Sequence, residues 1–424
     1  MPIRLAALAA GLSLLAVASG AAAQPFTLAD AHESVARSHP DLRLFVPRRN
    51  GLEAEARAAA LRPALELQAD LENVLGSGPL QGIRSAELTL SLSGVLERGG
   101  KREARRALAA TRIDALGVQR AAMQLDLLAE TTRRYLDLAA LQAQRPLLDE
   151  DLAQRQRIAR AARQRFAAGA APEASALAAE AEVAQAKARL VAVDAQQAAA
   201  WRRLSLLWGE PTGNAAVPEV LPVPEAVPEL PTLTELTARI AEAPELAAFA
   251  DEARIREARL RLAETEASPD VRWSAGVRRL QDGRDMGIVA GFSLPLGTRQ
   301  RAEPAIAAAR AEREALAMQR ESAALQLEAV AVDAWSQVES GALQADRLRT
   351  EVLPRLERAA AQSERAYRAG ALSYLEWAVV QTDITTSRLA LLEARVAAQR
   401  ALIELQRLTA DSWTAGDARE GENE

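Results

Sequence analysis

The pattern of hydrophobic and polar positions changes along the chain, and its longest uniform stretch is helical. From Lys101 to Phe166 the residues are almost all alanine, leucine, arginine, glutamate, glutamine and aspartate, which are strong helix formers. At a rise of about 1.5 Å per residue, this stretch predicts a helix of roughly 100 Å. Gly169 ends it, because glycine readily adopts the positive φ of a helix end. A second helix from Pro172 to about Trp208 then completes a very long antiparallel hairpin.

Two stretches before this hairpin alternate apolar and polar residues with a period of two. Leucine or alanine occupies positions 65, 67, 69 and 71, and leucine occupies positions 88, 90 and 92. A turn rich in glycine and proline separates the two stretches. This alternation predicts a β-hairpin, within residues of about 64–96, that has one apolar and one polar face.

The second half of the chain repeats the first. Tyr367 and Gly370 stand where Phe166 and Gly169 stand in the first half, and both pairs are 201 positions apart (367 − 166 and 370 − 169). A second pair of alternating stretches falls at about 270–296, and a second helical hairpin at about 299–408. This agreement predicts an internal duplication. The fold class is therefore mainly α with a small β part: two long helical hairpins and four strands.

The domain boundaries follow from this duplication. We expect a first structural repeat over 24–231, a second over 232–410, and a disordered polar tail over 411–424. Six prolines between positions 211 and 231 predict an extended linker rather than a packed element; a disordered segment between two domains is the alternative. Pro146 and Pro354 each predict a kink in a long helix.

The first 23 residues have the pattern of a secretory signal peptide. Arg4 precedes an apolar stretch, and Ala21-Ala22-Ala23 offers a cleavage site before Gln24. A transmembrane anchor is the alternative, but the apolar stretch is short for one. We therefore expect an exported protein, and no other stretch resembles a transmembrane helix.

The composition argues against several classes of function. The net charge of −5, without a dominant basic surface, disfavours nucleic acid as a partner. Cysteine is absent, which excludes disulfides, thiolate metal sites and a cysteine nucleophile. The two histidines, His32 and His39, lie near the N-terminus, and no phosphate-binding loop is found. We expect no enzyme activity, no catalytic or cofactor-binding residues and no metal ligands.

The predicted strands are suited to a membrane. Strands of about ten residues cross a bilayer when tilted, and one apolar and one polar face match a barrel with lipid outside and water inside. Four strands cannot close a usable barrel, and open edges are not tolerated in lipid, so several chains must contribute. The alternative is a soluble sheet packed on the helices. The polar faces would line a lumen through Glu66, Asp70, Glu72, Arg272 and Arg278. Both charge signs occur there, so charge selectivity stays open.

Three short stretches carry a resemblance to a known family: Ser38-His39-Pro40-Asp41-Leu42, Leu96-Glu97-Arg98-Gly99-Gly100-Lys101-Arg102 and Tyr367-Arg368-Ala369-Gly370. With the order of elements, they make nearly the whole mature chain resemble the TolC family of outer-membrane efflux proteins. The Gly-Gly-Lys-Arg stretch is similar to the heavy-metal branch typified by CzcC. The resemblance implies a homotrimer with a twelve-stranded β-barrel above an α-helical barrel that crosses the periplasm.

The resemblance also implies partners and site residues. The chain would be the exit duct of a tripartite pump, together with a periplasmic adaptor protein and an inner-membrane efflux transporter. The adaptor would dock on the helical tips, at Phe166, Gly169, Tyr367 and Gly370. Acidic residues near the tips would narrow the duct, and the candidates are Glu376, Asp383 and Glu173.

Other interpretations stay open. Glu376 as a surface carboxylate and Tyr367 as helix-end packing are the alternatives for these two residues. For the whole chain, the alternatives to heavy-metal efflux are drug efflux, a type I secretion duct, and a soluble periplasmic coiled-coil structural protein without a pore.

Overall fold

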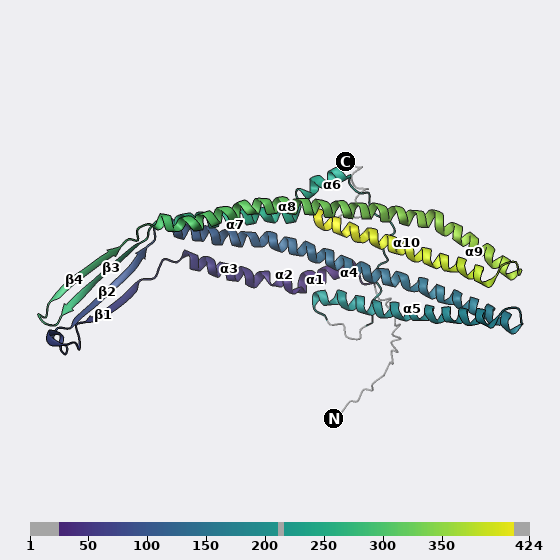
Figure 1. The fold of residues 1–424 in the computed structure, drawn as a ribbon, viewed down its shortest axis with the longest axis horizontal. Helices are drawn as coiled ribbons and strands as arrows, with labels where there is room; N and C mark the ends of the chain where they lie inside the picture. The colour runs from purple at the N-terminus through teal and green to yellow at the C-terminus, as the bar shows by residue number, and fades with distance from the viewer. Residues whose placement is uncertain (1–24, 211–215, 411–424) are drawn as a thin grey trace, which may run out of the picture.

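The computed structural model describes residues 25–210 and 216–410, and in it the chain is long and narrow. Figure 1 shows the four strands at one end, the tips of two helical hairpins at the other, and a short helix midway. The predicted signal peptide, the predicted tail and the first five linker positions lie outside the described residues. The fold class is confirmed: long helical hairpins with one small antiparallel sheet.

The first half of the chain forms one short helical segment, two strands and one long hairpin. Its helices are α1 (Leu28–Ser38), α2 (Pro40–Arg43), α3 (Phe45–Ala60), α4 (Lys101–Ala167) and α5 (Glu173–Ser205), with a 3₁₀ turn at Leu206–Trp208. Thr27 and Asp30 form a capping box at the start of α1. At the tip, Gly169 has a φ of 71°, the left-handed conformation that ends the helix without steric cost.

The second half follows the same order, but it has two short helices in place of three before its strands, and its first long helix is divided. Its helices are α6 (Leu233–Ile240), α7 (Pro244–Thr265), α8 (Thr298–Arg347), α9 (Leu353–Arg368) and α10 (Tyr374–Thr409). A π-helical turn, Leu348–Val352, separates α8 from α9, whose second residue is Pro354. The interruption expected at Pro354 is therefore this π turn, which places the proline in the first turn of α9, where its missing N–H is not needed. By contrast, α4 runs through Pro146 without leaving the helical conformation.

The four strands form one antiparallel sheet in chain order. They are β1 (Glu66–Glu72), β2 (Glu87–Leu96), β3 (Val271–Leu280) and β4 (Met286–Ser293). The central strands β2 and β3 have ten residues each, whereas β1 has seven and β4 has eight. The edge strands β1 and β4 are thus shorter than the sequence pattern predicts.

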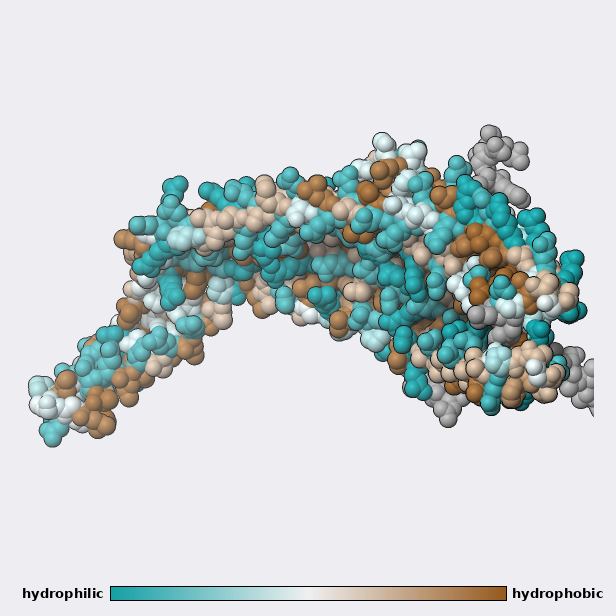
Figure 2. Space-filling model, turned by 45° about the vertical axis from the view of Figure 1, so that its right-hand side comes forward, coloured by the Kyte–Doolittle hydropathy of each residue, from teal (hydrophilic) through white to brown (hydrophobic). Residues whose placement is uncertain are grey.

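The helices do not cover this sheet. On its apolar face the side chains of Leu67, Ile288 and Phe292 are 73%, 86% and 84% exposed. Figure 2 shows apolar residues gathered along one side of the projecting strands. The alternative of a soluble sheet packed on the helices is therefore wrong, because the strands project beyond the end of the helical body (Figure 1).

The buried core lies in the helical body instead. One cluster joins α1, α4 and α5 around Leu138, Leu204 and Trp208, and a second joins α6, α8 and α10 around Leu236 and Leu405. Both clusters include or touch residues of the proline-rich segment. The helices and the proline-rich segment therefore pack against each other near the middle of the molecule.

The proline-rich segment is extended, as expected, but it is packed, which corrects the sequence prediction. Val220 is buried, and the Gln142 side chain donates to the Pro218 carbonyl at 2.7 Å and accepts from Val220 N at 3.0 Å. The Tyr135 hydroxyl accepts from Leu221 N at 2.9 Å. Side chains of α4 thus supply the hydrogen-bond partners that an extended, proline-rich backbone cannot find within itself.

Candidate functional site

The polar face of the sheet is organised around one arginine. Arg278 Nη1 lies 3.0 Å from Glu87 Oε2, its Nη2 lies 3.4 Å from Glu72 Oε2, and its Nε donates to Thr89 Oγ1 at 3.0 Å. Opposite strands place these groups side by side, since Thr89 pairs with both Asp70 and Arg278 in the register. The structure therefore brings together Asp70, Glu72 and Arg278 of the five predicted lumen residues.

The other two predicted lumen residues lie nearer the helical body. Arg272 pairs with Val95 and Ser293, and Glu66 pairs with Ser93. At the end away from the helical body, the polar face thus carries three acidic groups, Asp70, Glu72 and Glu87, and one arginine, Arg278. At the end next to the helical body it carries one acid, Glu66, and one arginine, Arg272. The sequence analysis missed Glu87 as a lumen candidate, although it begins the second alternating stretch.

On the apolar face one glycine lies close to a tryptophan of the neighbouring strand. A Cβ atom built on Gly94 would lie 2.8 Å from Leu65 and 3.1 Å from the ring of Trp273, the residue opposite Gly94 on β3. A larger residue at this position would force the Leu65 side chain and the indole ring to shift. Trp273 and Phe292 are paired neighbours on this face.

A buried ion cluster marks the junction of strands and helices. Lys101 is 6% exposed, and its Nζ lies 2.9 Å from Asp270 Oδ2 and 3.4 Å from Glu266 Oε2. Burial lowers the pKa of Lys101, but the hydrogen bond that it donates to Asp270 and the charge of Glu266 outweigh this and raise the pKa. Asp270 Oδ1 also accepts from Arg98 N at 3.1 Å. These contacts thus link the turn before α4 to the turn before β3, which is far away in the sequence. We call the ion pair between Lys101 and Asp270 the junction clasp.

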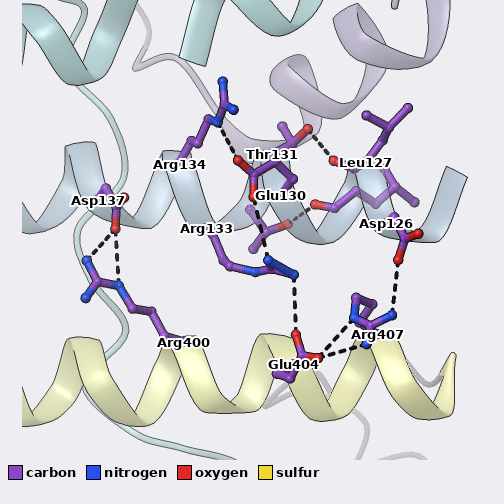
Figure 3. Close-up of polar contacts among 12 residues, drawn as sticks. Asp126, Leu127, Glu130, Thr131, Arg133, Arg134, Asp137, Arg400, Glu404 and Arg407 are labelled. Atoms are coloured by element: carbon purple, nitrogen blue, oxygen red, sulfur yellow. Dashed lines mark hydrogen bonds and ion pairs between the residues drawn. The ribbon is translucent and has the colours of Figure 1, made fainter. Parts of the chain in front are cut away.

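The seam between the two hairpins is a line of ion pairs between α4 and α10. Figure 3 shows the part of the seam farther from the tips: Arg400 Nη2 lies 2.6 Å from Asp137, and Arg407 Nη1 lies 3.1 Å from Asp126. Arg133 of α4 reaches Glu404 of α10 at 3.4 Å. Further toward the tips, Arg388 lies 2.7 Å from Glu150. In three of these four pairs the arginine is on α10 and the acid is on α4. In the fourth pair, Arg133 and Glu404, the arginine is on α4 and the acid is on α10.

The two tips lie together at the end of the hairpins (Figure 1). Tyr367 stacks on Trp377 at 4.7 Å between ring centroids, and the guanidinium of Arg165 lies over the Tyr367 ring at 5.3 Å. Arg165 belongs to the first tip, next to Phe166, so this cation–π contact joins the two tips. Gly370 has a φ of 76°, as Gly169 has 71°. The four predicted docking residues therefore occupy one compact end of the molecule.

The predicted constriction residues lie in three different settings. Glu376 is the third residue of α10, and its carboxylate accepts from Ser373 Oγ at 2.6 Å and from Ser373 N at 2.9 Å. The Ser373 hydroxyl and amide lower the pKa of Glu376. Asp383 lines a groove of about 530 Å³ between α4, α5 and α10. Glu173 is the exposed first residue of α5.

Sequence reasoning missed several of these residues. The spacing Ser373-x-x-Glu376 is a capping-box pattern and could have been read from the sequence. Arg165, Trp377 and the seam pairs could not, because their partners are far away in sequence. In the residues that the structure describes, no group of three or more histidine, aspartate or glutamate side chains is placed to hold a metal ion. Likewise, none of the described helices combines the length and the apolar character of a membrane span.

Known proteins are similar to this chain in part of its sequence and in its fold. Residues 33–210 match the model of a family described as outer membrane efflux protein. A membrane protein from Pseudomonas aeruginosa has a similar structure, with a TM-score of 0.75 and 20% identity over 92% of this chain and 91% of that one. The search of curated proteins found no match.

Two further structures extend the comparison. The outer membrane protein VceC from Vibrio cholerae has a TM-score of 0.72 and 19% identity over 91% of this chain and 97% of that one. The Neisseria gonorrhoeae MtrE outer membrane channel, in its open state, has a TM-score of 0.71 and 18% identity over 92% of this chain and 90% of that one. The described chain therefore has the fold of outer-membrane channels, and its residues 33–210 match the outer membrane efflux protein family.

Proposed function

We propose that the protein is the exit duct of an efflux pump, placed in the bacterial outer membrane and reaching into the periplasm. The observation that carries this proposal is the uncovered sheet. Its apolar face is exposed over four strands, and an exposed apolar surface of this kind in a membrane protein is a lipid-facing surface. The match to the outer membrane efflux protein family and the likeness to outer-membrane channels support the same function.

The duct would be a homotrimer. In lipid, β1 and β4 must pair with other strands, because backbone groups at an open edge would lack partners. Three chains of four strands would make a twelve-stranded barrel, and the two structural repeats, 24–231 and 232–410, would place six hairpins around the periplasmic part. Glu66, Asp70, Glu72, Arg272 and Arg278 would then line the lumen of the barrel.

The partners would act at the opposite end. A periplasmic adaptor would dock at the tips formed by Phe166, Gly169, Tyr367 and Gly370, and an inner-membrane transporter would drive the cargo into the duct. Glu376, Asp383 and Glu173 would narrow the passage near the tips. The shared position of the two tips, held by Arg165 and Tyr367, supports a single docking surface.

The cargo would be heavy-metal cations. This part of the proposal rests on the resemblance of the stretch around Gly99, Gly100 and Lys101 to the heavy-metal branch. The buried ion pair between Lys101 and Asp270 gives that stretch a structural role here. The stretch therefore indicates relationship to the heavy-metal branch and is not itself proposed as a metal site. A duct needs no tight cargo site, because strong binding slows release.

The first experiment is membrane fractionation of the expressed chain, followed by detergent extraction and measurement of the mass of the extracted species. An outer-membrane species of three chain masses supports the duct. A soluble periplasmic monomer would exclude it and would favour a coiled-coil structural protein without a pore. Drug efflux and type I secretion are then separated from metal efflux by a deletion strain, which should lose resistance to heavy-metal salts but keep its drug resistance and protein secretion.

A further inference from the structure

In the part of the seam nearer the tips, Arg388 forms ion pairs with both hairpins. Its Nη1 lies 2.7 Å from Glu150 Oε2 on α4, in the other hairpin, and its Nη2 lies 3.1 Å from Glu357 Oε1 on α9, in its own hairpin. A charge-assisted pair on each side fixes the guanidinium between the two hairpins. This contact is therefore one of the ion pairs that hold α10 in register against α4.

The internal repeat gives each of these residues a counterpart. Counting back 201 positions from Arg388 and Glu357 gives Lys187 on α5 and Gln156 on α4, and counting forward 201 positions from Glu150 gives Glu351. The counterparts keep the charge signs of the ion pair between hairpins: a cation at Lys187 and an acid at Glu351. The contact within the hairpin changes, because Gln156 is an uncharged amide.

The structure places two of the counterparts together. Gln156 and Lys187 both line one cavity of about 450 Å³ between α4 and α5. This matches the way Glu357 and Arg388 lie together between α9 and α10. Lys187 therefore occupies the position of Arg388, but the counterpart of Glu357 beside it is the amide of Gln156 and not a carboxylate.

The third counterpart lies on the opposite edge of the molecule. Figure 1 shows α5 along one long side and α8 with α9 along the other. Both sides expose large apolar side chains: Val191 of α5 is 70% exposed, and Leu343 of α8 is 60% exposed. One chain cannot bring Lys187 to Glu351, because α4 and α10 lie between them.

We propose that a second copy of the chain occupies this edge, with Lys187 of one copy paired to Glu351 of the next as Arg388 is paired to Glu150 within a copy. The inference rests on the proposed homo-oligomeric duct and names the contact that sets its register. Each seam around the helical barrel would then carry the same cation-to-acid contact, alternately inside a chain and between chains.

Both residues have charged neighbours on their own helices. In the structure Glu351 pairs along its own helix with Arg347 and with Arg355, so it lies between two cations. On α5, Glu182 lies five positions before Lys187, and its side chain is half exposed. In the antiparallel register that joins Lys187 to Glu351, Arg355 falls opposite Val183. Glu182 is already paired with Arg155 of α4, and Arg355 with Glu351, so the proposed contact between chains is the single pair of Lys187 and Glu351.

The absence of cysteine from the chain makes the contact directly testable. The variant Lys187→Cys with Glu351→Cys is treated in the membrane with a short bifunctional maleimide and run on a denaturing gel. We expect the band to shift from one chain mass to two and three chain masses. The matched internal pair, Glu150→Cys with Arg388→Cys, reacts within one chain and leaves the band at one chain mass. Mass spectrometry of the digested protein confirms that this internal link has formed.

Two controls separate the outcomes. Lys187→Cys with Glu339→Cys should give no link between chains, because Glu339 lies about 18 Å farther along α8. The oligomer is measured independently by the mass of the detergent-extracted species. If that species is a trimer and the internal pair reacts, but Lys187→Cys with Glu351→Cys stays at one chain mass, the inference is wrong and the duct stands. If the species is a monomer, the proposed function fails first.

Discussion

The guanidinium of Arg278 on β3 reaches across β2 to Glu72 on β1, with Nη2 3.4 Å from Oε2. On the way it lies 3.0 Å from the carboxylate of Glu87 on β2. One cation thus joins three strands and separates two carboxylates that face each other in the register, since Glu72 pairs with Glu87. The sequence showed both charge signs on this face; the structure shows which of them are neutralised.

Replacing Arg278 should weaken the sheet. Arg278→Gln leaves Glu72 and Glu87 opposite each other without a cation, and like charges directly across two strands are destabilising. The arginine is partly exposed, so we expect a loss of about 1 kcal/mol in the free energy of unfolding. The measurement is the thermal denaturation midpoint of the detergent-extracted protein. Arg272→Gln on the same face is the control, and equal midpoints for the two variants would contradict the role given to Arg278.

Removing one partner of the junction clasp, the ion pair between Lys101 and Asp270, should lower the free energy of unfolding more than replacing Arg278 does. Asp270→Asn leaves the buried ammonium of Lys101 with only Glu266, which lies farther away at 3.4 Å and is half exposed. We expect a loss of about 3 kcal/mol, the usual effect of an uncompensated buried charge. Glu266→Gln is the milder control. Chemical denaturation measures both, and the double variant Lys101→Met with Asp270→Asn should recover part of the loss; no recovery would argue against a charge effect.

The tip glycines should be sensitive to a single methyl group. Gly370 has a φ of 76°, and nothing lies within 4 Å of a Cβ atom built there, so the cost of Gly370→Ala is backbone strain alone. We expect a loss of about 1 kcal/mol. Gly117→Ala is the control, because Gly117 is exposed within α4 with equally open space, and there alanine should stabilise the helix by about 0.5 to 1 kcal/mol. Opposite signs in thermal denaturation are expected; the same sign for both would refute the strain argument.

The contact of Tyr135 with the proline-rich segment can be tested by removing one oxygen atom. The hydroxyl donates to Phe26 O at 2.8 Å and accepts from Leu221 N at 2.9 Å, and the residue is 7% exposed. Tyr135→Phe leaves both backbone groups without this partner and should cost about 1 to 3 kcal/mol. Hydrogen exchange gives the specific readout: the Leu221 amide should exchange faster. Thr111→Val, which loses a bond within one helix, should leave that amide unchanged.

Stability should fall as the pH falls below about 6.5 through one histidine. Burial lowers the pKa of His32 from its usual 6.5, because the charged ring is poorly solvated against α4. The unfolded chain therefore binds the proton at a higher pH than the folded chain does, and unfolding becomes easier as the pH falls from 6.5 toward the lowered pKa. The His32→Gln variant should lose this part of the pH dependence in denaturation curves. An unchanged slope between wild type and variant would show that other groups cause it.

The sequence predicted the elements whose signals are local. The helix from Lys101 and its end at Gly169 follow from composition and from one glycine, and the strands follow from strict alternation over a few residues. The π turn at Leu348–Val352 has no comparable local signal beyond Pro354, which marks the place but not the kind of interruption. The sequence pattern predicts edge strands that are too long. Because β1 and β4 each pair with a neighbouring strand on one side only, their ladders of hydrogen bonds end earlier.

Residues of the candidate site could be predicted from the sequence only where their role depends on residues close to them in the chain. The tip glycines and the acids of the polar strand face were found in this way. The contacts of Arg278, Lys101, Tyr135 and Arg388 were not, because each joins segments that only the folded chain brings together. The packing of the proline-rich segment was missed for the same reason: its partners are side chains of α4, and a proline count indicates only an extended backbone.

The order of the strands also constrains the symmetry of any assembly. The two free edges of the sheet, β1 and β4, are different surfaces, so joining them repeats a head-to-tail contact by rotation, and the assembly is cyclic. A two-fold dimer would instead pair β1 with β1 and set the row of Glu66, Asp70 and Glu72 against its own copy. The negative charges along this edge therefore disfavour two-fold symmetry, and they keep the free strand β1 from pairing with a copy of itself.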